Sequence, residues 1–158
     1  MNFLEFIKRK TTTDQLINMV SISVSENEVP LVELQKDQWS KGEDKFGQTI
    51  GVYKPFTEKV AREESPNTPK IAGEPYNLNW TGDLMRSTNI KTRKVTNDLL
   101  VQIDSTSSNL LPLFDTIERY GLLSNPNTIF GYQNEKKDVA TRLINKGTLR
   151  KLKQKYNV

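Results

Sequence analysis

The sequence predicts an α+β fold with N-terminal helices, a long aromatic-rich loop or arm, a small antiparallel β-hairpin or sheet, and a C-terminal helix. Near both ends of the chain apolar residues recur every three or four positions, which is the period of an amphipathic helix. Around residues 88–104 the pattern changes to alternation, which indicates strands. Because 158 residues suffice for one domain of ordinary size with a real core, we expect a single domain.

Residues 1–38 are expected to form a helical N-terminal part of two or three pieces. Thr12, followed three positions later by Gln15, resembles a capping box and marks a helix start. Pro30 suits the first turn of a further helix, where its missing N–H is no loss. Residues 20–24 also alternate as a strand would, so the period alone leaves that short stretch open.

Residues 39–87, called the arm below, hold both tryptophans and five of the eight glycines, and no sustained helical or strand period covers them. We expect only short helices in the arm, over 57–64 and just after Trp80. Loops this long are usually functional or disordered, and regularly spaced aromatic residues argue against disorder. The arm should therefore bury its aromatics against its own domain or a neighbouring subunit. The predicted interface residues are Trp39, Phe46, Tyr53, Phe56, Tyr76, Trp80 and Arg86.

Residues 88–133 are expected to form the hairpin and a short helix. Thr96, Asn97 and Asp98 give a turn signal, and the alternating segment 99–103 after it is the second strand. Pro112 suits the first turn of a short helix over 113–120.

Residues 134–158 are expected to form a basic C-terminal helix. The sequence leaves open whether this helix breaks at Gly147 and Thr148, with Thr148 capping a final piece, or continues unbroken. From Lys136 onward there are eight Lys and Arg against one acidic residue, whereas the rest of the chain has 15 basic and 18 acidic residues. This asymmetry fits contact with DNA or an acidic partner, and equally a solvated helix with cations near its carboxyl end. The residues that could make such a contact are Arg142, Lys146, Arg150, Lys151, Lys153 and Lys155.

The composition argues against an enzyme. The chain has no cysteine and no histidine, which removes thiolate ligands and the commonest general base and metal ligand. The adjacent acids Glu43–Asp44 and Glu63–Glu64 lie in polar surroundings, and such pairs are normally just solvated. We therefore expect no catalytic residues, no cofactor and no metal, with a phage-associated glycan hydrolase as a less favoured alternative. No apolar run approaches the ~20 residues that span a bilayer, so no membrane association is expected.

The order of several short motifs resembles a known family. The motifs are Trp39-Ser40-x-Gly42, a second turn ending at Gly51, Tyr53-x-Pro55-x-Thr57, Thr81-Gly82-Asp83-Leu84-x-x-Ser87 before a hairpin, Tyr120-Gly121, and Ile129-Phe130-Gly131 before a final helix. This series is similar to small bacteriophage virion-morphogenesis and tail-completion (head–tail neck) proteins, especially those of Bacteroidetes phages. The resemblance covers about residues 39–146. The sequence departs from the family pattern in a long insert at 63–79.

The resemblance implies a non-enzymatic structural protein of the virion, assembled in the cytoplasm of the bacterial host. It implies a head–tail connector or tail-completion subunit that forms a homo-oligomeric ring and contacts neighbouring copies through residues 39–87. Implied partners are portal-side adaptor or tail tube proteins, and DNA passing through the channel. The alternative from the charge pattern is a nucleic-acid-binding accessory protein that uses the basic C-terminal helix.

Overall fold

The computed structural model describes residues 3–64, 70–79, 82–119, 123 and 125–157. It confirms the predicted α+β class, with N-terminal helices, a two-stranded antiparallel hairpin and a long C-terminal helix. The elements are α1 (Phe3–Lys10), α2 (Thr13–Glu26), α3 (Glu28–Ser40), α4 (Pro55–Glu64), α5 (Asp83–Ser87), β1 (Thr88–Val95), β2 (Asp98–Ser105), α6 (Leu110–Arg119), the 3₁₀ helix η1 (Pro126–Ile129) and α7 (Asn134–Tyr156).

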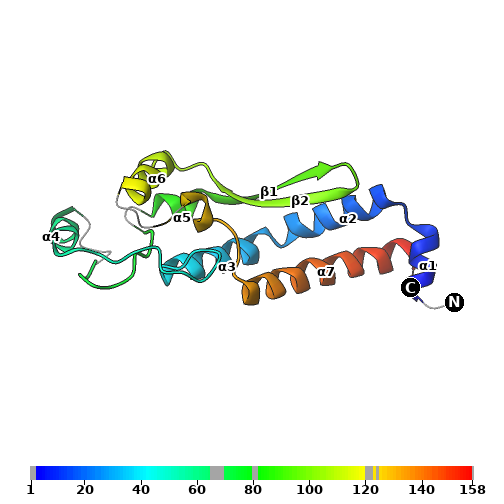
Figure 1. Ribbon diagram of the computed structural model, residues 1–158. Helices are drawn as coiled ribbons and strands as arrows, with labels where there is room; N and C mark the ends of the chain where they lie inside the picture. The colour runs from blue at the N-terminus through cyan, green and yellow to red at the C-terminus, as the bar shows by residue number, and fades with distance from the viewer. Residues whose placement is uncertain (1–2, 65–69, 80–81, 120–122, 124, 158) are drawn as a thin grey trace.

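The elements are arranged in three layers along an elongated body (Figure 1). Helices α2 and α3 follow one another along the middle, α7 runs back beside them, and the β1–β2 hairpin lies along the other side of α2. The far end of α7 reaches the beginning of the chain, where the hydroxyl of Tyr156 donates to the carbonyl of Lys10 at 2.8 Å. Helix α4 stands at the opposite end of the molecule, beyond α3.

The predicted capping box forms at the start of α2. The Thr12 hydroxyl accepts a hydrogen bond from the Gln15 backbone N–H at 3.2 Å, and the Gln15 side chain accepts from the Thr12 N–H at 3.3 Å. The alternating stretch 20–24 is helical because α2 continues through it. Only Asn27 separates α2 from α3, so the two helices make one interrupted rod.

Helix α7 continues unbroken through Gly147 and Thr148, which decides between the two alternatives that the sequence left open. A Cβ atom built on Gly147 would lie 2.2 Å from the hydroxyl oxygen of Ser23, so the glycine lets α2 and α7 approach closely. The Ser23 hydroxyl donates to the Ile144 carbonyl at 2.7 Å across this crossing. Thr148 is buried and bonds back to the same carbonyl at 2.9 Å. Close packing therefore explains the glycine better than a helix stop does.

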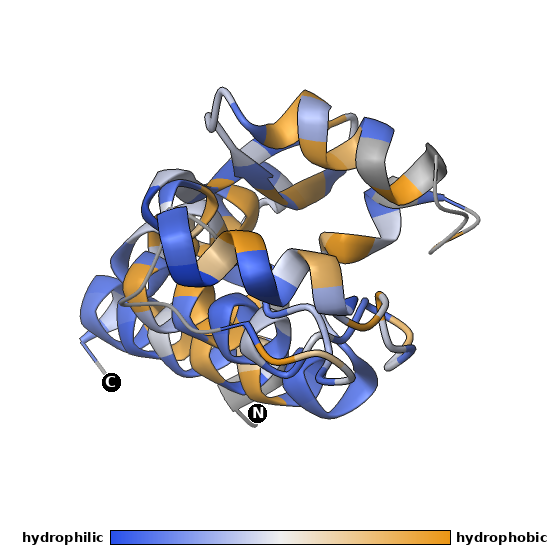
Figure 2. Cartoon of the chain, turned by 90° about the vertical axis from the view of Figure 1, so that its left-hand side faces the viewer, coloured by the Kyte–Doolittle hydropathy of each residue, from blue (hydrophilic) through white to orange (hydrophobic). Residues whose placement is uncertain are grey.

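Two apolar clusters form the core. One lies between α2, α3 and α7 and centres on Val24, Leu31 and Ala140. The other lies near α6 and η1, where Ile50 of the arm packs with Ile117 and its neighbours. Viewed along the long axis from the α4 end, hydrophilic residues dominate the outer turns, and hydrophobic residues concentrate where elements face one another (Figure 2).

The hairpin pairs all eight residues of each strand without a bulge, from Thr88 opposite Ser105 to Val95 opposite Asp98. Its inner face packs on the helices, because Ile90 contacts the Val24 cluster and the Thr92 hydroxyl lies 3.1 Å from the Ser21 hydroxyl. The predicted hairpin is therefore confirmed.

Candidate functional site

The first part of the arm is fastened to the body by α3. Trp39 is fully buried, its indole N–H donates to the Ile129 carbonyl at 2.7 Å, and its ring meets Phe130 edge-on at 5.5 Å. The Gln35 amide donates to that same carbonyl at 3.1 Å and accepts from the Gly131 N–H at 2.9 Å. Trp39 therefore belongs to the core of this chain, and the prediction that it contacts a neighbouring subunit is wrong.

A tight turn built on Asp44 follows. The buried Asp44 carboxylate accepts from the backbone N–H groups of Phe46 and Gln48 at 2.8 and 2.9 Å. The Lys45 N–H donates to the Thr128 carbonyl at 2.9 Å, which holds the turn against η1. The turn leaves Phe46 68% exposed, with the Lys45 ammonium 5.1 Å from the centroid of its ring. Phe46 is thus an aromatic side chain presented to solvent on a backbone with fixed hydrogen bonds.

Tyr53 anchors the middle of the arm. Its ring is buried and meets Tyr76 edge-on at 4.7 Å, and its hydroxyl donates to the Asn77 side-chain oxygen at 2.9 Å. Burial raises the pKa of the Tyr53 hydroxyl. Tyr53 therefore joins the middle of the arm to its later segment around Tyr76 and Asn77, and the prediction that it contacts another subunit is wrong. Tyr76 is half-buried and packs on the Ile50 cluster.

Lys70 is a buried cation within this anchor. Only 2% of the residue is exposed, and its ammonium donates to the Asn77 side chain at 2.7 Å and to the Asn79 carbonyl at 2.6 Å. The same ammonium lies 5.4 Å from the centroid of the Tyr53 ring. Burial lowers the pKa of Lys70, because an apolar setting disfavours the charged form.

Helix α4 lies on the outer side of this anchor. Ala61 faces inward and is buried, whereas Phe56 in the first turn is 75% exposed. The Glu58 carboxylate accepts from the Ala72 N–H at 2.9 Å and pairs with Arg62. The Ala72 hydrogen bond, followed by the one from Arg62, lowers the pKa of Glu58. This contact ties α4 to the returning chain.

Among the described residues of the arm, four large apolar side chains remain exposed after it has folded against the body. We call them the exposed arm residues: Phe46, Val52, Phe56 and Ile71. Two of them, Phe46 and Phe56, were predicted as interface residues, whereas composition does not single out Val52 and Ile71. Of the other predicted interface residues, Arg86 on α5 is exposed, and Trp80 lies outside the described residues.

The predicted basic residues lie along α7, where they differ in their partners. Arg150 and Lys151 both pair with Glu26 of α2, at 2.8 and 2.5 Å. The Lys151 hydrogen bond is the main cause of the lowered pKa of Glu26. Part of the positive charge of α7 is therefore already neutralised within the chain. Two further predicted residues make local contacts: Arg142 donates to the Asp138 carbonyl, and Lys155 lies over the Tyr156 ring.

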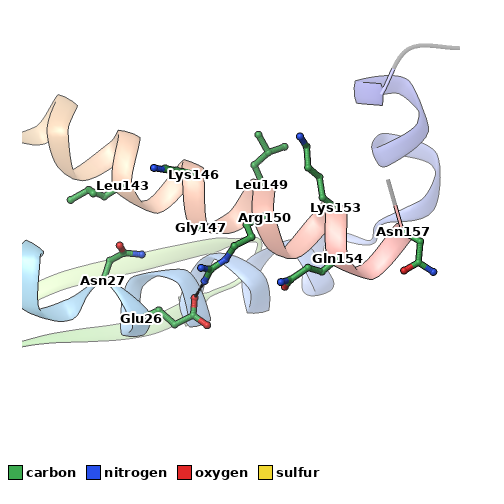
Figure 3. A pocket seen from close by; sticks show the side chains of 10 residues that line it. All are labelled: Glu26, Asn27, Leu143, Lys146, Gly147, Leu149, Arg150, Lys153, Gln154 and Asn157. Atoms are coloured by element: carbon green, nitrogen blue, oxygen red, sulfur yellow. Dashed lines mark hydrogen bonds and ion pairs between the residues drawn. The ribbon is translucent and has the colours of Figure 1, made fainter.

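Lys146 and Lys153 line a groove of about 910 Å³ between α7 and the end of α2, together with Arg150 and the apolar Leu149 (Figure 3). Within the described ranges neither lysine has an ion-pair partner. Because α7 is unbroken, both lysines share one side of it with Arg150. The groove therefore places two cations without an ion-pair partner among the described residues beside the paired Glu26 and Arg150.

The part of the chain that the structure describes offers neither a metal site nor a membrane-spanning helix. Those residues contain no group of three or more acidic side chains placed to hold a metal ion. Nor does any helix among them have the length and apolarity needed to cross a membrane. The two acidic pairs singled out from the sequence have different surroundings. Asp44 accepts hydrogen bonds within its own turn, and the Glu43 carboxylate accepts one from the Gln133 side chain at 2.7 Å. Glu63 and Glu64 are both exposed at the end of α4.

No protein-family model, no curated protein and no solved structure matched this chain.

Proposed function

We propose that this protein is a non-enzymatic structural subunit of a phage particle, a head–tail connector or tail-completion component that contacts neighbouring copies through its arm. The observation that carries the proposal is the contrast within the arm. Trp39 fastens the arm to the body and Tyr53 joins two segments of the arm, while Phe46 and Phe56 stay 68% and 75% exposed. The motif series described above supports the phage context.

The exposed arm residues suit an interface because their backbones are already ordered. Phe46 lies on the Asp44 turn, and Phe56 lies in the first turn of α4, whose Glu58 is hydrogen-bonded to Ala72. Ordering flexible groups is one of the main costs of association, so anchors presented on a fixed backbone bind with a smaller entropic loss. Buried aromatic anchors also dominate the energetics of most interfaces. Scattered exposed apolar residues are common on any protein, so the proposal rests on the rigid presentation of these two rings.

The proposal is tested by replacing the two rings and measuring assembly. In Phe46→Ser/Phe56→Ser we expect self-association, or association with portal-side adaptor or tail tube proteins, to weaken by about 30-fold or more. That figure corresponds to the loss of one hot-spot contact of about 2 kcal/mol. Native mass spectrometry and light scattering measure the populations of monomer, homo-oligomer and mixed complex.

The matched control is Val29→Ser/Leu111→Ser, because both side chains are 73% exposed and lie outside the arm. The control should assemble like the unmodified chain, and both double variants should unfold at nearly the same urea concentration as that chain. A chain that stays monomeric alone and with every candidate neck or tail protein would contradict the proposal.

A nucleic-acid contact is the second candidate, favoured by one observation. Lys146 and Lys153 line a groove without an acidic partner in the described residues, so they are available for phosphate. We propose this contact as an accessory to the structural role, in which DNA passes the α7 side of the subunit.

A further inference from the structure

The two outer edges of the β1–β2 hairpin differ, and the difference can be read from one hydrogen bond. The Ile90 N–H donates to the Glu28 carboxylate at 3.1 Å, so this amide points away from β2. In an antiparallel pair, inward-pointing and outward-pointing residues alternate along each strand. Ile90 lies opposite Ile103, so the outward-pointing backbone groups of β2 belong to Leu99, Val101, Ile103 and Ser105.

The β1 edge is protected. Glu28 at the start of α3 occupies the Ile90 amide, and α3 packs against this strand. Three cations, Lys91, Arg93 and Lys94, are spread along β1. Covering an edge and placing charge on it are both ways in which proteins prevent a further strand from pairing.

The β2 edge has no such protection. No charged residue lies between Leu99 and Ile103, the strand contains no proline, and its register with β1 has no bulge. Leu100 and Val101 are 44% and 38% exposed. The hydrogen bonds of the described residues include none from the outward amides of Leu99, Val101 and Ile103, whereas Ser105 donates to the Asp104 carboxylate. A regular edge whose central residues 99–103 carry no charge accepts another strand.

We propose that β2 pairs with β2 of a second copy, antiparallel across a two-fold axis, to form a four-stranded sheet β1–β2–β2–β1. The occupant is a second copy because any strand is complementary to itself in the antiparallel sense. The β1 edge of that copy is covered by Glu28, so a continuous β1–β2–β1 series is blocked. This contact uses a surface distinct from the arm and goes beyond the proposed function.

Charge restricts the register of this pairing. Outward residues of one strand must face outward residues of the other. A register centred on Val101 places Asp98 opposite Asp104 of the second copy, twice, and like charges directly opposite are unfavourable. The two adjacent registers avoid this repulsion. One places Leu100 opposite Leu100 of the second copy, and the other places Gln102 opposite Gln102.

Cysteine crosslinking tests the pairing directly, because the chain contains no cysteine of its own. In either register the facing residues form a non-hydrogen-bonded pair with Cβ atoms about 5 Å apart, within reach of a disulfide after a small adjustment. We expect the full-length chain carrying Leu100→Cys or Gln102→Cys to form a covalent dimer under mild oxidation. The matched control is Arg93→Cys, which lies opposite Leu100 on the solvent face but on β1, and should stay monomeric on a denaturing gel.

The proposal would be overturned if both β2 variants failed to form a covalent dimer. It would also be overturned if Arg93→Cys formed the dimer as readily as they do. Repeating the experiment with Phe46→Ser/Phe56→Ser separates the two interfaces, because the β2 crosslink should persist when the arm contact is lost. If the arm proposal fails, the same crosslink is still expected.

Proline substitution provides a second measurement on the edge. Val101→Pro removes an outward amide that makes no bond to β1, so the hairpin should survive while the edge loses a donor. We expect the dissociation constant of the two-fold contact to rise at least tenfold. Thr92→Pro removes an outward amide of β1 and is the control, which should leave association unchanged. Equal weakening in both variants, or in neither, would contradict the proposal; if Val101→Pro does not fold, the cysteine variants decide.

Discussion

Lys70 shows how one residue determines the character of the arm anchor. Its ammonium is buried and is bonded to Asn77 and Asn79 rather than to a carboxylate. Such a group costs free energy while it is charged, because it has left water without gaining an opposite charge. The anchor is therefore a place where pH should affect stability.

The pH dependence follows from the lowered pKa of Lys70. Between that lowered value and the ordinary 10.5, the unfolded chain binds the proton more strongly than the folded chain does. The unfolding free energy of the unmodified chain, relative to that of Lys70→Met, should therefore rise with pH in this window. Below the lowered pKa of Lys70, the difference in unfolding free energy between the two chains should not depend on pH. Urea unfolding between pH 7 and pH 10.5 measures this, with the exposed Lys59→Met as control. A difference that does not change with pH would refute the expected linkage.

Trp39 and Phe46 are aromatic residues seven positions apart with opposite roles. Replacing the buried Trp39 by Phe removes the hydrogen bond to Ile129 and leaves unfilled volume, so we expect a loss of about 1–3 kcal/mol in unfolding free energy. Phe46→Leu on the surface should change stability by less than about 0.5 kcal/mol. Urea titration compares the two. Trp39→Phe should assemble like the unmodified chain. If this variant folds but no longer assembles, Trp39 is an interface residue after all.

At the scale of elements, the crossing of α2 and α7 depends on small side chains. Gly147 faces Ser23 with no room for a Cβ atom, and Ala140 is buried in the same interface. Helix propensity alone favours alanine over glycine by about 1 kcal/mol. Packing opposes that preference, and the geometry shows which of the two effects is larger.

Gly147→Ala should therefore destabilise the protein, by about 1–3 kcal/mol, because the added methyl group overlaps Ser23. Ser23→Gly in the same chain should recover most of the loss, since it removes the overlapping atoms. Thermal or urea unfolding of both single variants and the double variant gives the coupling between the two sites. Independent, additive effects would mean that the helices do not meet at this point.

At the scale of the whole molecule, the exposed arm residues and the charged groove lie on different elements. The apolar side chains belong to the arm, which extends to α4 at one end of the body, whereas the groove lies along α7 (Figures 1 and 3). A subunit that touches neighbours through its arm could therefore keep its basic side free for DNA. This separation allows the two contacts to be tested independently.

Salt dependence distinguishes a DNA contact from a solvated basic helix. Each lysine that touches phosphate contributes about 0.9 to the slope of log affinity against log salt. Lys146→Glu/Lys153→Glu should lower that slope by about 2 and weaken binding to duplex DNA. Lys59→Glu/Lys137→Glu, at exposed sites outside the groove, has the same change in charge and should leave the slope almost unchanged. If the two double variants show the same slope of log affinity against log salt, the change in DNA binding comes from net charge alone.

The sequence by itself determined the elements that arise from neighbouring residues. The Thr12–Gln15 cap, the alternation before Ile103 and the helix that begins at Asn134 are all interactions within a few positions, so a local pattern suffices to predict them. Only the tertiary structure decided that Trp39 is buried while Phe46 is exposed. Their partners explain this: Trp39 bonds to Ile129, ninety positions away, and such long-range contacts leave no mark in the local pattern. Gly147 is the same case, because a helix-breaking residue type became a packing residue through contact with Ser23.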